Sequence, residues 1–327
     1  MANVLVTGGA GFIGSHMVDF LIERDNKVRV IDNLISGKPI NLLQHKNNKN
    51  LILDERDIRD VSADDSIYKE LDYIYHFAGI GDIVPSIDKP LEYMSVNTQG
   101  TVKVCEGARH NNIKKLVYAA SSSCYGLAKV PTDEKAQIST QYPYALSKYL
   151  GECSVLHWNK VYGLPVNVIR IFNAYGTRSK TGGSYGAVFG VFLKQKLSNK
   201  PFTVVGNGNQ KRDFLFVTDV VRAFYKACKT KKVGEIYNLG AGNPQTINYL
   251  VKLLKGPVKY IPKRPGEPEV TWADITKIVN ELDWKPNVSF EEGVKKILEN
   301  IEYWKDAPLW DENSIKIATK TWFNNLL

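Results

Sequence analysis

The segment "VLVTGGAGFIGSHMVDFLIE", residues 4–23, constrains the fold of this chain more than any other segment. It places a glycine-rich turn between a β-branched strand and an amphipathic helix. Gly8, Gly11 and Gly14 leave no side chain where the backbone must turn and approach a ligand. The helix that follows offers free N–H groups and the positive end of its dipole. The segment therefore predicts a binding site for a pyrophosphate.

The next strand ends in "VRVIDN", which puts Asp32 18 residues beyond Gly14. A carboxylate at that place can accept hydrogen bonds from both hydroxyls of an adenosine ribose, and it would repel a 2′-phosphate. The two features together predict NAD as the cofactor and favour it over NADP. The alternative is that Asp32 is a solvated residue that caps a turn.

Short β-branched runs recur through the first half of the chain, with helix-length segments between them. The runs are "NVLVTG", "KVRVID", "NLILDERD", "YIYHFAG", "KLVYAAS" and "VNVIRIFN". Apolar strands that alternate with helices indicate a parallel sheet with both faces covered. We therefore predict an α/β fold with a doubly wound parallel sheet of the Rossmann type.

After about residue 175 the pattern becomes irregular, because glycine clusters and a proline-rich stretch (257–268) interrupt short helices. We predict that residues 1–175 form the NAD-binding domain and that residues 176–327 form a smaller mixed α/β domain for the substrate. Segments within about 213–240, including the strand-like "EIYNLGAG", are expected to return to the first sheet.

The formal net charge of +9 could indicate a nucleic-acid partner, but the lysines are dispersed and no basic run is interleaved with aromatic residues. No stretch approaches the roughly 18 apolar residues of a membrane span. The four cysteines form no CxxC pair and the five histidines show no metal-ligand spacing. We therefore expect a cytoplasmic protein with no metal site, no nucleic-acid partner and no membrane association.

The stretch "YPYALSK" places Tyr144 and Lys148 four residues apart, which puts them on one face of a helix. An ammonium group beside a phenol favours the phenolate and lowers the phenol pKa toward neutrality. A hydroxyl from Ser121–Ser123, at the end of a preceding strand, could bind the same substrate oxygen. This set suits removal of a proton from an alcohol while its carbon gives hydride to a nicotinamide. The alternative is that Tyr144 and Lys148 lie on a solvated helix face.

With these motifs the sequence resembles the extended short-chain dehydrogenase/reductases that modify nucleotide-diphosphate sugars. The resemblance covers nearly the whole chain. It rests on these motifs: "TGGAGFIG", "IDNLISGK", "RDI" (56–58), "HFAG" (76–79), "SVNTQGT" (95–101), "SSSCYG", "YPYALSK", "RIFNAYG", "VVGNGNQKRDFLFVTDV", "YNLGAG" and "RPGEPEVTWADITKIVNELDWKP".

The resemblance implies roles for further residues. Ser121 would be the catalytic hydroxyl, Tyr144 the base, and Lys148 would also hold the nicotinamide ribose. Other residues would line the NAD site together with Gly8, Gly11, Gly14 and Asp32: Phe12, Ile13, Asn33, Ser36, Gly37, Asp57, Ile58, Phe77, Ala78, Gly79 and Asn97. Asn173, Arg212 and Arg264 would meet the diphosphate of the sugar nucleotide, since two guanidiniums suit a doubly anionic ligand. The alternative for Arg212 is a surface ion pair with Asp213.

Enzymes of this family oxidise C4 of the sugar, and the fate of the 4-keto intermediate differs. Epimerases return hydride to the other face, whereas 4,6-dehydratases abstract the C5 proton and expel the C6 hydroxyl, usually with an Asp-Glu pair. Here those positions are Ser122 and Ser123, in the sugar site, and a serine does not easily serve as that acid or base. We therefore predict a 4-epimerase of a UDP-type hexose or N-acetylhexosamine.

A 4,6-dehydratase of a GDP-, UDP- or dTDP-linked sugar stays the alternative. Asp82, in "GDIVPSI", lies on the loop that contacts the sugar in this family and could supply the missing carboxylate. The tail "ENIEYWKDAPLWDENS" also resembles dehydratases of bacterial surface-sugar pathways. A non-catalytic NAD-binding protein is the competing class, but such proteins generally lose the Tyr or the Lys.

Two further expectations come from the resemblance. Thr271 precedes "WAD" and would border the hexose pocket near C2, where a small residue leaves room for a 2-acetamido group. The alternative for Thr271 is a strand residue that faces the core. The family usually dimerises through two helices, here 92–111 and 143–160, so we expect a homodimer.

Overall fold

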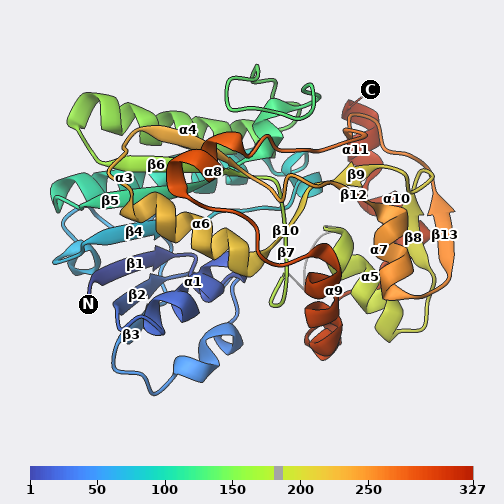
Figure 1. Ribbon diagram of the computed structural model, residues 1–327, viewed down its shortest axis with the longest axis horizontal. Helices are drawn as coiled ribbons and strands as arrows, with labels where there is room; N and C mark the ends of the chain where they lie inside the picture. Colours follow the sequence, from blue (N-terminus) through green and yellow to red (C-terminus); the bar gives the residue numbers. More distant parts are fainter. Residues whose placement is uncertain (180–186, 327) are drawn as a thin grey trace.

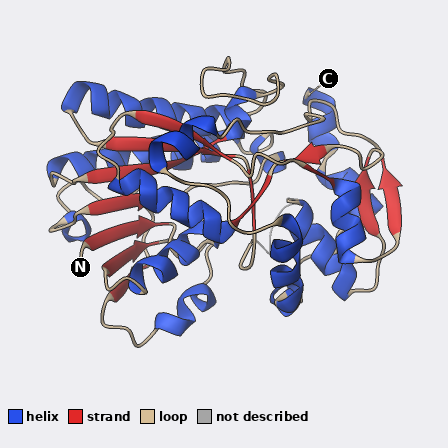
Figure 2. Ribbon diagram, viewed as in Figure 1, coloured by secondary structure: helices blue, strands red, loops and turns tan. Residues whose placement is uncertain are grey.

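The computed structural model describes residues 1–179 and 187–326. Its largest element is a seven-stranded parallel sheet with the strand order β3-β2-β1-β4-β5-β6-β11 (Figures 1 and 2). The strands are β1 (Asn3–Thr7), β2 (Lys27–Ile31), β3 (Leu51–Asp54), β4 (Tyr73–His76), β5 (Lys115–Ser121), β6 (Val166–Ile171) and β11 (Glu235–Leu239).

Helices cover both faces of this sheet. On one face lie α1 (Phe12–Ile22) and α6 (Val217–Lys229), and on the other lie α3 (Gly100–His110) and α4 (Pro143–Tyr162). Strand β1 shows the consequence, because Val4 and Val6 pack in the first of these layers while Leu5 packs in the second. Burial on both faces explains the continuous apolar runs, and the prediction of a doubly wound parallel sheet is confirmed.

The second half of the chain builds a smaller group of elements, which Figure 1 shows on the side away from the N-terminus. Strands pair there in three small sheets: β7 (Asn173–Tyr175) with β10 (Phe214–Phe216), β9 (Lys211–Arg212) with β12 (Gln245–Thr246), and β8 (Phe202–Val205) with β13 (Val258–Ile261). The helices of this group are α5 (Val188–Leu197), α7 (Ile247–Leu254), α9 (Phe290–Glu299), α10 (Glu312–Ala318) and α11 (Lys320–Asn325), whereas α8 (Thr276–Leu282) packs in the core of the large sheet. A separate core that includes Phe192, Phe202 and Trp304 holds most of this group together.

Parts of the second half return to the large sheet. Strand β11 pairs with β6, and α6 covers the sheet beside α1. These returning elements lie within or next to the segment 213–240 that the sequence singled out. The division of the chain at residue 175 stays a prediction.

The backbone is helical from Pro90 to His110, where the sequence predicted a helix over 92–111. It consists of α2 (Pro90–Tyr93), a π-helical stretch (Met94–Gln99) and α3. No sequence signal pointed to the π-helical stretch, which carries Asn97.

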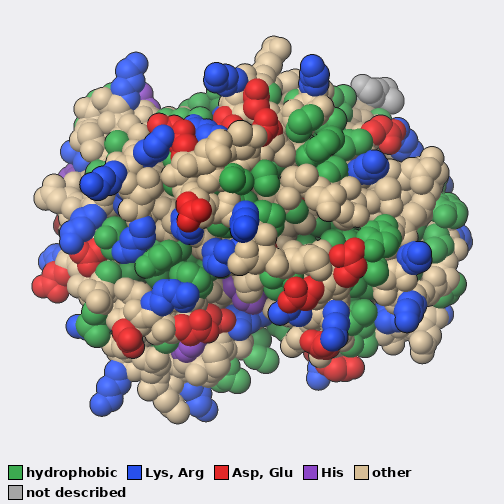
Figure 3. Space-filling view, in the orientation of Figure 1, with side chains coloured by type: hydrophobic (Ala, Val, Ile, Leu, Met, Phe, Trp, Pro, Cys, Tyr) green, Lys and Arg blue, Asp and Glu red, His purple; other side chains and the backbone are tan. Residues whose placement is uncertain are grey.

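The surface carries no single basic stripe on the face that Figure 3 shows, where Lys and Arg side chains are scattered among Asp and Glu. Across residues 1–179 and 187–326, no helix combines the length and apolar character that a bilayer crossing requires. The same residues contain no group of three or more His, Cys, Asp and Glu that could hold a metal ion.

Candidate active site

The glycine-rich turn has no room for side chains. Gly8 has φ +68°, and a Cβ there would lie 2.8 Å from Ala78 N. A Cβ on Gly14 would lie 2.1 Å from the carbonyl oxygen of Gly8. Gly11 is the N-cap of α1, and no side chain of the described residues caps this helix end. The N–H groups of Phe12 and Ile13 in the first turn can therefore meet an anionic ligand, as the pyrophosphate of NAD would require.

Asp32 lies at the carboxyl end of β2 and is 8% exposed. Its carboxylate accepts hydrogen bonds from Ala10 N and Leu34 N, both at 2.9 Å, and burial raises its pKa. A Cβ on Gly37 would lie 2.7 Å from both carboxylate oxygens, so a glycine is needed beside it. The alternative of a solvated turn cap is wrong, because Asp32 is buried and braces the glycine-rich turn. Ser36, next to Gly37, is exposed.

Asn33 and Asp57 meet beyond the ends of β2 and β3. Asn33 Nδ2 donates to Asp57 Oδ2 at 2.7 Å, and Arg59 donates to both oxygens of Asp57 at 2.9 and 2.8 Å. The Arg59 bond is the main cause that lowers the pKa of Asp57 to about 2. Ile58 is buried and packs against Gly100. Sequence reasoning missed Arg59, although it directly follows the "RDI" motif.

The segment after β4 carries three of the predicted cofactor residues. Phe77 packs against Phe224 with ring centroids 4.6 Å apart, and Ala78 N donates to Thr7 Oγ1 at 3.1 Å. A Cβ on Gly79 would lie 2.8 Å from Asn97 Oδ1.

Asn97 ties this segment to α4. Its Oδ1 accepts from Ile80 N at 2.8 Å, and its Nδ2 donates to Ser147 Oγ at 3.0 Å. The predicted NAD residues after β4 and on the π-helical stretch therefore lie together with the helix that carries Tyr144.

Ser121, Tyr144 and Lys148 also come together. Ser121 ends β5, and its side chain interacts with the phenol of Tyr144, in the first turn of α4, and lowers the pKa of that phenol. Ser121 Oγ also accepts from Ser123 N at 3.2 Å. Lys148 follows one turn later, is 7% exposed, and has its Nζ 4.4 Å from the centre of the Tyr118 ring. The geometry fits one hydroxyl–phenol–ammonium centre.

The pKa of Tyr144 differs from the sequence expectation. Burial raises it, the Ser121 hydrogen bond lowers it in part, and the charge of Asp82 raises it further. Burial lowers the pKa of Lys148 to about 7, against the opposing charge of Glu152. The expectation that Lys148 lowers the Tyr144 pKa toward neutrality is therefore wrong for this structure. Near neutral pH Lys148 is about half charged, and burial of the phenol dominates.

A buried ion pair between Arg170 on β6 and Glu152 on α4 lies next to these side chains. Arg170 donates to both oxygens of Glu152, at 2.9 and 2.5 Å, and the two side chains are 4% and 2% exposed. Arg170 also donates to Tyr125 Oη at 2.6 Å. The pair thus joins α4 to the turn that follows Ser121. Sequence reasoning missed both residues, since a lone Arg on a strand carries no local signal.

Asp82 and a group of aromatic rings lie near Tyr144. Tyr93 Oη donates to the carbonyl oxygen of Asp82 at 2.6 Å. Tyr142, which sequence reasoning missed, lies parallel to Tyr144 with ring centroids 6.5 Å apart. The Ser123 side chain interacts with the Tyr142 hydroxyl and lowers its pKa, and Ser122 lies beside Ser123 in the same short turn. Trp322 from α11 packs on Tyr142 at 5.3 Å.

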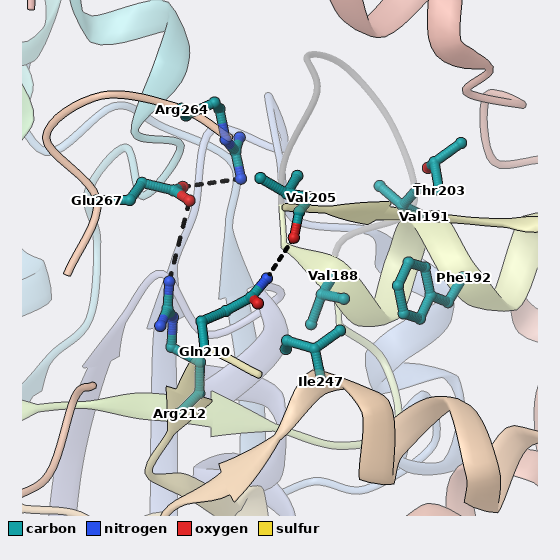
Figure 4. Close-up of a pocket in the computed structure, with 10 residues that line it drawn as sticks. All are labelled: Val188, Val191, Phe192, Thr203, Val205, Gln210, Arg212, Ile247, Arg264 and Glu267. Atoms are coloured by element: carbon teal, nitrogen blue, oxygen red, sulfur yellow. Dashed lines mark hydrogen bonds and ion pairs between the residues drawn. The ribbon is translucent and has the colours of Figure 1, made fainter. Parts of the chain in front are cut away.

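Arg212 and Arg264 line one cavity of about 80 Å³ (Figure 4). Glu267 lies between them, 2.8 Å from Arg264 and 3.9 Å from Arg212. Both arginine side chains are largely buried, at 16% and 15% exposure. The remaining wall is mostly apolar and includes Val188 and Ile247. Sequence reasoning missed Glu267, although it follows Arg264 by three residues.

Asp213 is fully buried and does not form the surface ion pair that was the alternative for Arg212. Its carboxylate accepts from Ala241 N at 2.8 Å, Gly242 N at 3.2 Å and Ala273 N at 2.9 Å. It therefore joins two loops beside the cavity.

Asn173 and Thr271 lie next to this junction. Asn173 begins β7, and Thr271 Oγ1 donates to Asn173 Oδ1 at 2.6 Å. Because Thr271 is half-buried and bonded to polar groups, the alternative of a core-facing strand residue does not hold.

The chain matches known proteins over most of its length. Residues 4–240 match the model of the NAD dependent epimerase/dehydratase family. A putative UDP-glucose 4-epimerase of Methanocaldococcus jannaschii is 36% identical over 304 residues, which cover 90% of this chain and 97% of that protein.

Solved structures agree with this match. A UDP-N-acetylglucosamine 4-epimerase from Methanobrevibacter ruminantium M1, in complex with UDP-N-acetylmuramic acid, superposes with a TM-score of 0.86 and 34% identity. The match covers 91% of this chain and 99% of that one. A dTDP-glucose 4,6-dehydratase from Streptomyces venezuelae, solved with NAD bound, has a TM-score of 0.85 and 27% identity over 93% of this chain and 99% of its own.

Proposed function

Since this chain belongs to the NAD dependent epimerase/dehydratase family, we propose that it is an NAD-dependent 4-epimerase of a UDP-linked hexose or N-acetylhexosamine. The observation that carries the proposal is the placement of the Ser121 side chain where it lowers the pKa of the Tyr144 phenol, with Lys148 one turn further along α4. The names of the related 4-epimerases support the same activity.

The chain's residues fit NAD along its whole length. The first-turn N–H groups of α1 would hold the pyrophosphate, and Asp32 would accept the hydroxyls of the adenosine ribose. Asn33 and Asp57 would border the adenine, and Lys148 would hold the nicotinamide ribose. Gly79 lets the segment after β4 pass close to Asn97, because a side chain there would collide with the Asn97 amide.

The proton chemistry belongs to Tyr144. When bound, NAD supplies the hydride acceptor at C4 of the sugar and a positive charge beside the site. Tyr144 would take the proton of the 4-hydroxyl and return it after the 4-keto sugar has rotated in the site to present its other face. Ser121 would donate a hydrogen bond to the same sugar oxygen. Because burial raises the pKa of Tyr144, its phenolate is the stronger base toward the 4-hydroxyl once it has formed.

The cavity in Figure 4 would take the diphosphate of the substrate. Two guanidiniums against the one carboxylate of Glu267 leave an excess of positive charge for a dianion. Arg212 and Arg264 would therefore bind the diphosphate, with Asn173 beside them.

A direct test uses the protein purified with its NAD. Addition of UDP-glucose or UDP-N-acetylglucosamine should produce a small steady fraction of reduced nicotinamide and a 4-epimeric product. A protein that keeps NAD oxidised and leaves both sugars unchanged would contradict the proposal.

The 4,6-dehydratase is the second candidate, and the position of Asp82 favours it. Its charge acts on Tyr144, so the carboxylate lies near the reacting sugar. Ser122 and Ser123, next to Ser121, provide no carboxylate for elimination.

Asp82→Asn separates the two candidates. For an epimerase we expect turnover to persist, with the rising limb of the pH profile shifted to lower pH, because loss of the Asp82 charge lowers the pKa of Tyr144. Asp88→Asn, on the same segment but exposed, should leave the profile unchanged. A wild-type product that lacks the C6 hydroxyl, together with a variant that no longer releases water, would identify a dehydratase.

Thr271→Tyr tests the width of the sugar pocket. We expect the wild type to convert the N-acetylhexosamine nucleotide at least as well as the plain hexose nucleotide. The tyrosine ring should selectively abolish conversion of the acetamido sugar, because overfilling a pocket costs about 1–3 kcal/mol. The ratio of kcat/KM for the two substrates is the measurement. A wild type that accepts the unsubstituted hexose alone would show that Thr271 does not set the pocket width.

We also propose that the protein is a homodimer. Helix α4 exposes Leu146 and Leu150, which lie one turn apart and suit a helix–helix contact with a second copy. All four cysteines are free, which suits the reducing conditions of the cytoplasm. A nucleotide-binding domain up to about residue 175 and a substrate domain beyond it remain our proposal for the domain division.

A further inference from the structure

Three segments meet at Thr271. Its backbone N–H donates to the carbonyl oxygen of Lys211 at 3.0 Å, and Ala273 N donates to the buried carboxylate of Asp213 at 2.9 Å. On the other side, Asn173 N donates to the carbonyl oxygen of Asp213 at 3.3 Å. The backbone on either side of the Thr271 side chain is thus fixed against the strand that carries Arg212 and Asp213.

The hydroxyl of Thr271 has a defined direction. It accepts from Asp213 N at 3.3 Å, and it lies 2.6 Å from Asn173 Oδ1. A separation of 2.6 Å is typical of an O–H donor on an oxygen acceptor and short for an N–H donor. The hydroxyl therefore donates its proton to Asn173 Oδ1, which fixes the orientation of the Asn173 amide.

This orientation leaves the amide nitrogen of Asn173 available to a ligand. Within the part of the chain that the structure describes, Asn173 Nδ2 donates to no protein group. Two N–H donors are therefore presented, while the amide oxygen is held away by Thr271. An amide turned by 180° would present its oxygen instead, and that oxygen would repel an anion.

We infer that Thr271 is a positioning residue that acts through Asn173: its hydroxyl holds the amide so that both N–H groups face the diphosphate of the nucleotide sugar. The inference rests on the proposed function, because it takes the diphosphate as the ligand of Asn173. This role depends on the hydroxyl of Thr271 and is separate from the pocket width that the size of the side chain would set.

Thr271→Val and Thr271→Ser separate the hydrogen bond from size. Valine keeps the shape of threonine but has no hydroxyl, whereas serine keeps the hydroxyl and is smaller. The measurement is the affinity of the NAD-loaded protein for UDP by titration calorimetry. We expect Thr271→Val to weaken UDP binding by about 3- to 10-fold, the range of one neutral hydrogen bond, and Thr271→Ser to stay within about 2-fold of the wild type.

A double-mutant cycle with Asn173→Ala shows whether Thr271 acts through Asn173. In the Asn173→Ala background, Thr271→Val should cause no further loss of UDP affinity. With the full substrate, Thr271→Val should raise KM and leave kcat unchanged, because the diphosphate is bound alike before and during the reaction. If Thr271→Val lowers the melting temperature, the same double-mutant cycle is measured with Thr271→Ala in its place.

Other outcomes would overturn the inference. Equal UDP affinity in wild type and Thr271→Val, or losses that add fully in the double variant, would show that Thr271 does not act through Asn173 while leaving the proposed function intact. A wild-type protein that binds no UDP would contradict the inference and the proposed function together.

Discussion

Tyr144→Phe is expected to lower turnover by at least about 10²-fold, the usual size of a general acid–base contribution. The Ser121 side chain lowers the pKa of this phenol in the structure, and the phenol is the group that would exchange a proton with the 4-hydroxyl of the sugar. Phenylalanine keeps the ring and its contacts with Tyr142 and Tyr93, so the fold and NAD affinity should be retained. Steady-state kinetics and a count of bound NAD per chain provide the two measurements.

A second phenol on the same helix is the matched control. Tyr149 interacts with Cys153, one turn further along α4, and Tyr149→Phe should turn over substrate at the wild-type rate. Near-normal activity of Tyr144→Phe would remove the proposed role of Tyr144.

Asp32→Ala is expected to weaken NAD binding by about 10- to 100-fold, which corresponds to the loss of hydrogen bonds to a charged group. The carboxylate braces the glycine-rich turn through Ala10 N and would also hold the adenosine ribose. Without the negative charge, discrimination against the 2′-phosphate of NADP should relax. Affinities for both cofactors, measured by calorimetry on protein stripped of nucleotide, test this expectation.

Asp32→Asn distinguishes the effect of the negative charge from the effect of the hydrogen bonds that support the glycine-rich turn. Its amide oxygen can still accept one of the two backbone hydrogen bonds, at Ala10 N or Leu34 N, so the turn should be better preserved than in the alanine variant. We expect Asp32→Asn to lose discrimination against NADP while losing less NAD affinity. A wild type that prefers NADP would show that the role given to Asp32 is wrong.

The main sheet could be predicted from the sequence because most of its strands are buried on both faces. Such strands read as continuous apolar runs, and every run that the sequence singled out corresponds to a strand of the large sheet. The glycine-rich turn could also be predicted from the sequence, since Gly8 and Gly14 lie where a Cβ would collide with the backbone. Local sequence gives no signal for the π-helical stretch at Met94–Gln99, which packs against α4.

The parts of the site that sequence reasoning missed are tertiary pairings. Glu267 matters because folding places it between Arg212 and Arg264. Arg170 and Glu152 matter because they meet behind the catalytic turn. The pKa of Tyr144 is raised, although the sequence predicted a lowered pKa. Spacing along a helix shows which groups are neighbours, but it does not show how burial changes their pKa values.

The most direct test of the proposed activity is an NMR analysis of products from a panel of nucleotide sugars, with the protein carrying its own NAD. We predict that UDP-N-acetylglucosamine and UDP-glucose convert to their 4-epimers with the C6 hydroxyl retained and without net consumption of NAD. A product with a methyl group at C6 would contradict 4-epimerisation and identify a 4,6-dehydratase. No conversion of any sugar in the panel would contradict the assignment of Ser121, Tyr144 and Lys148 as a reaction centre.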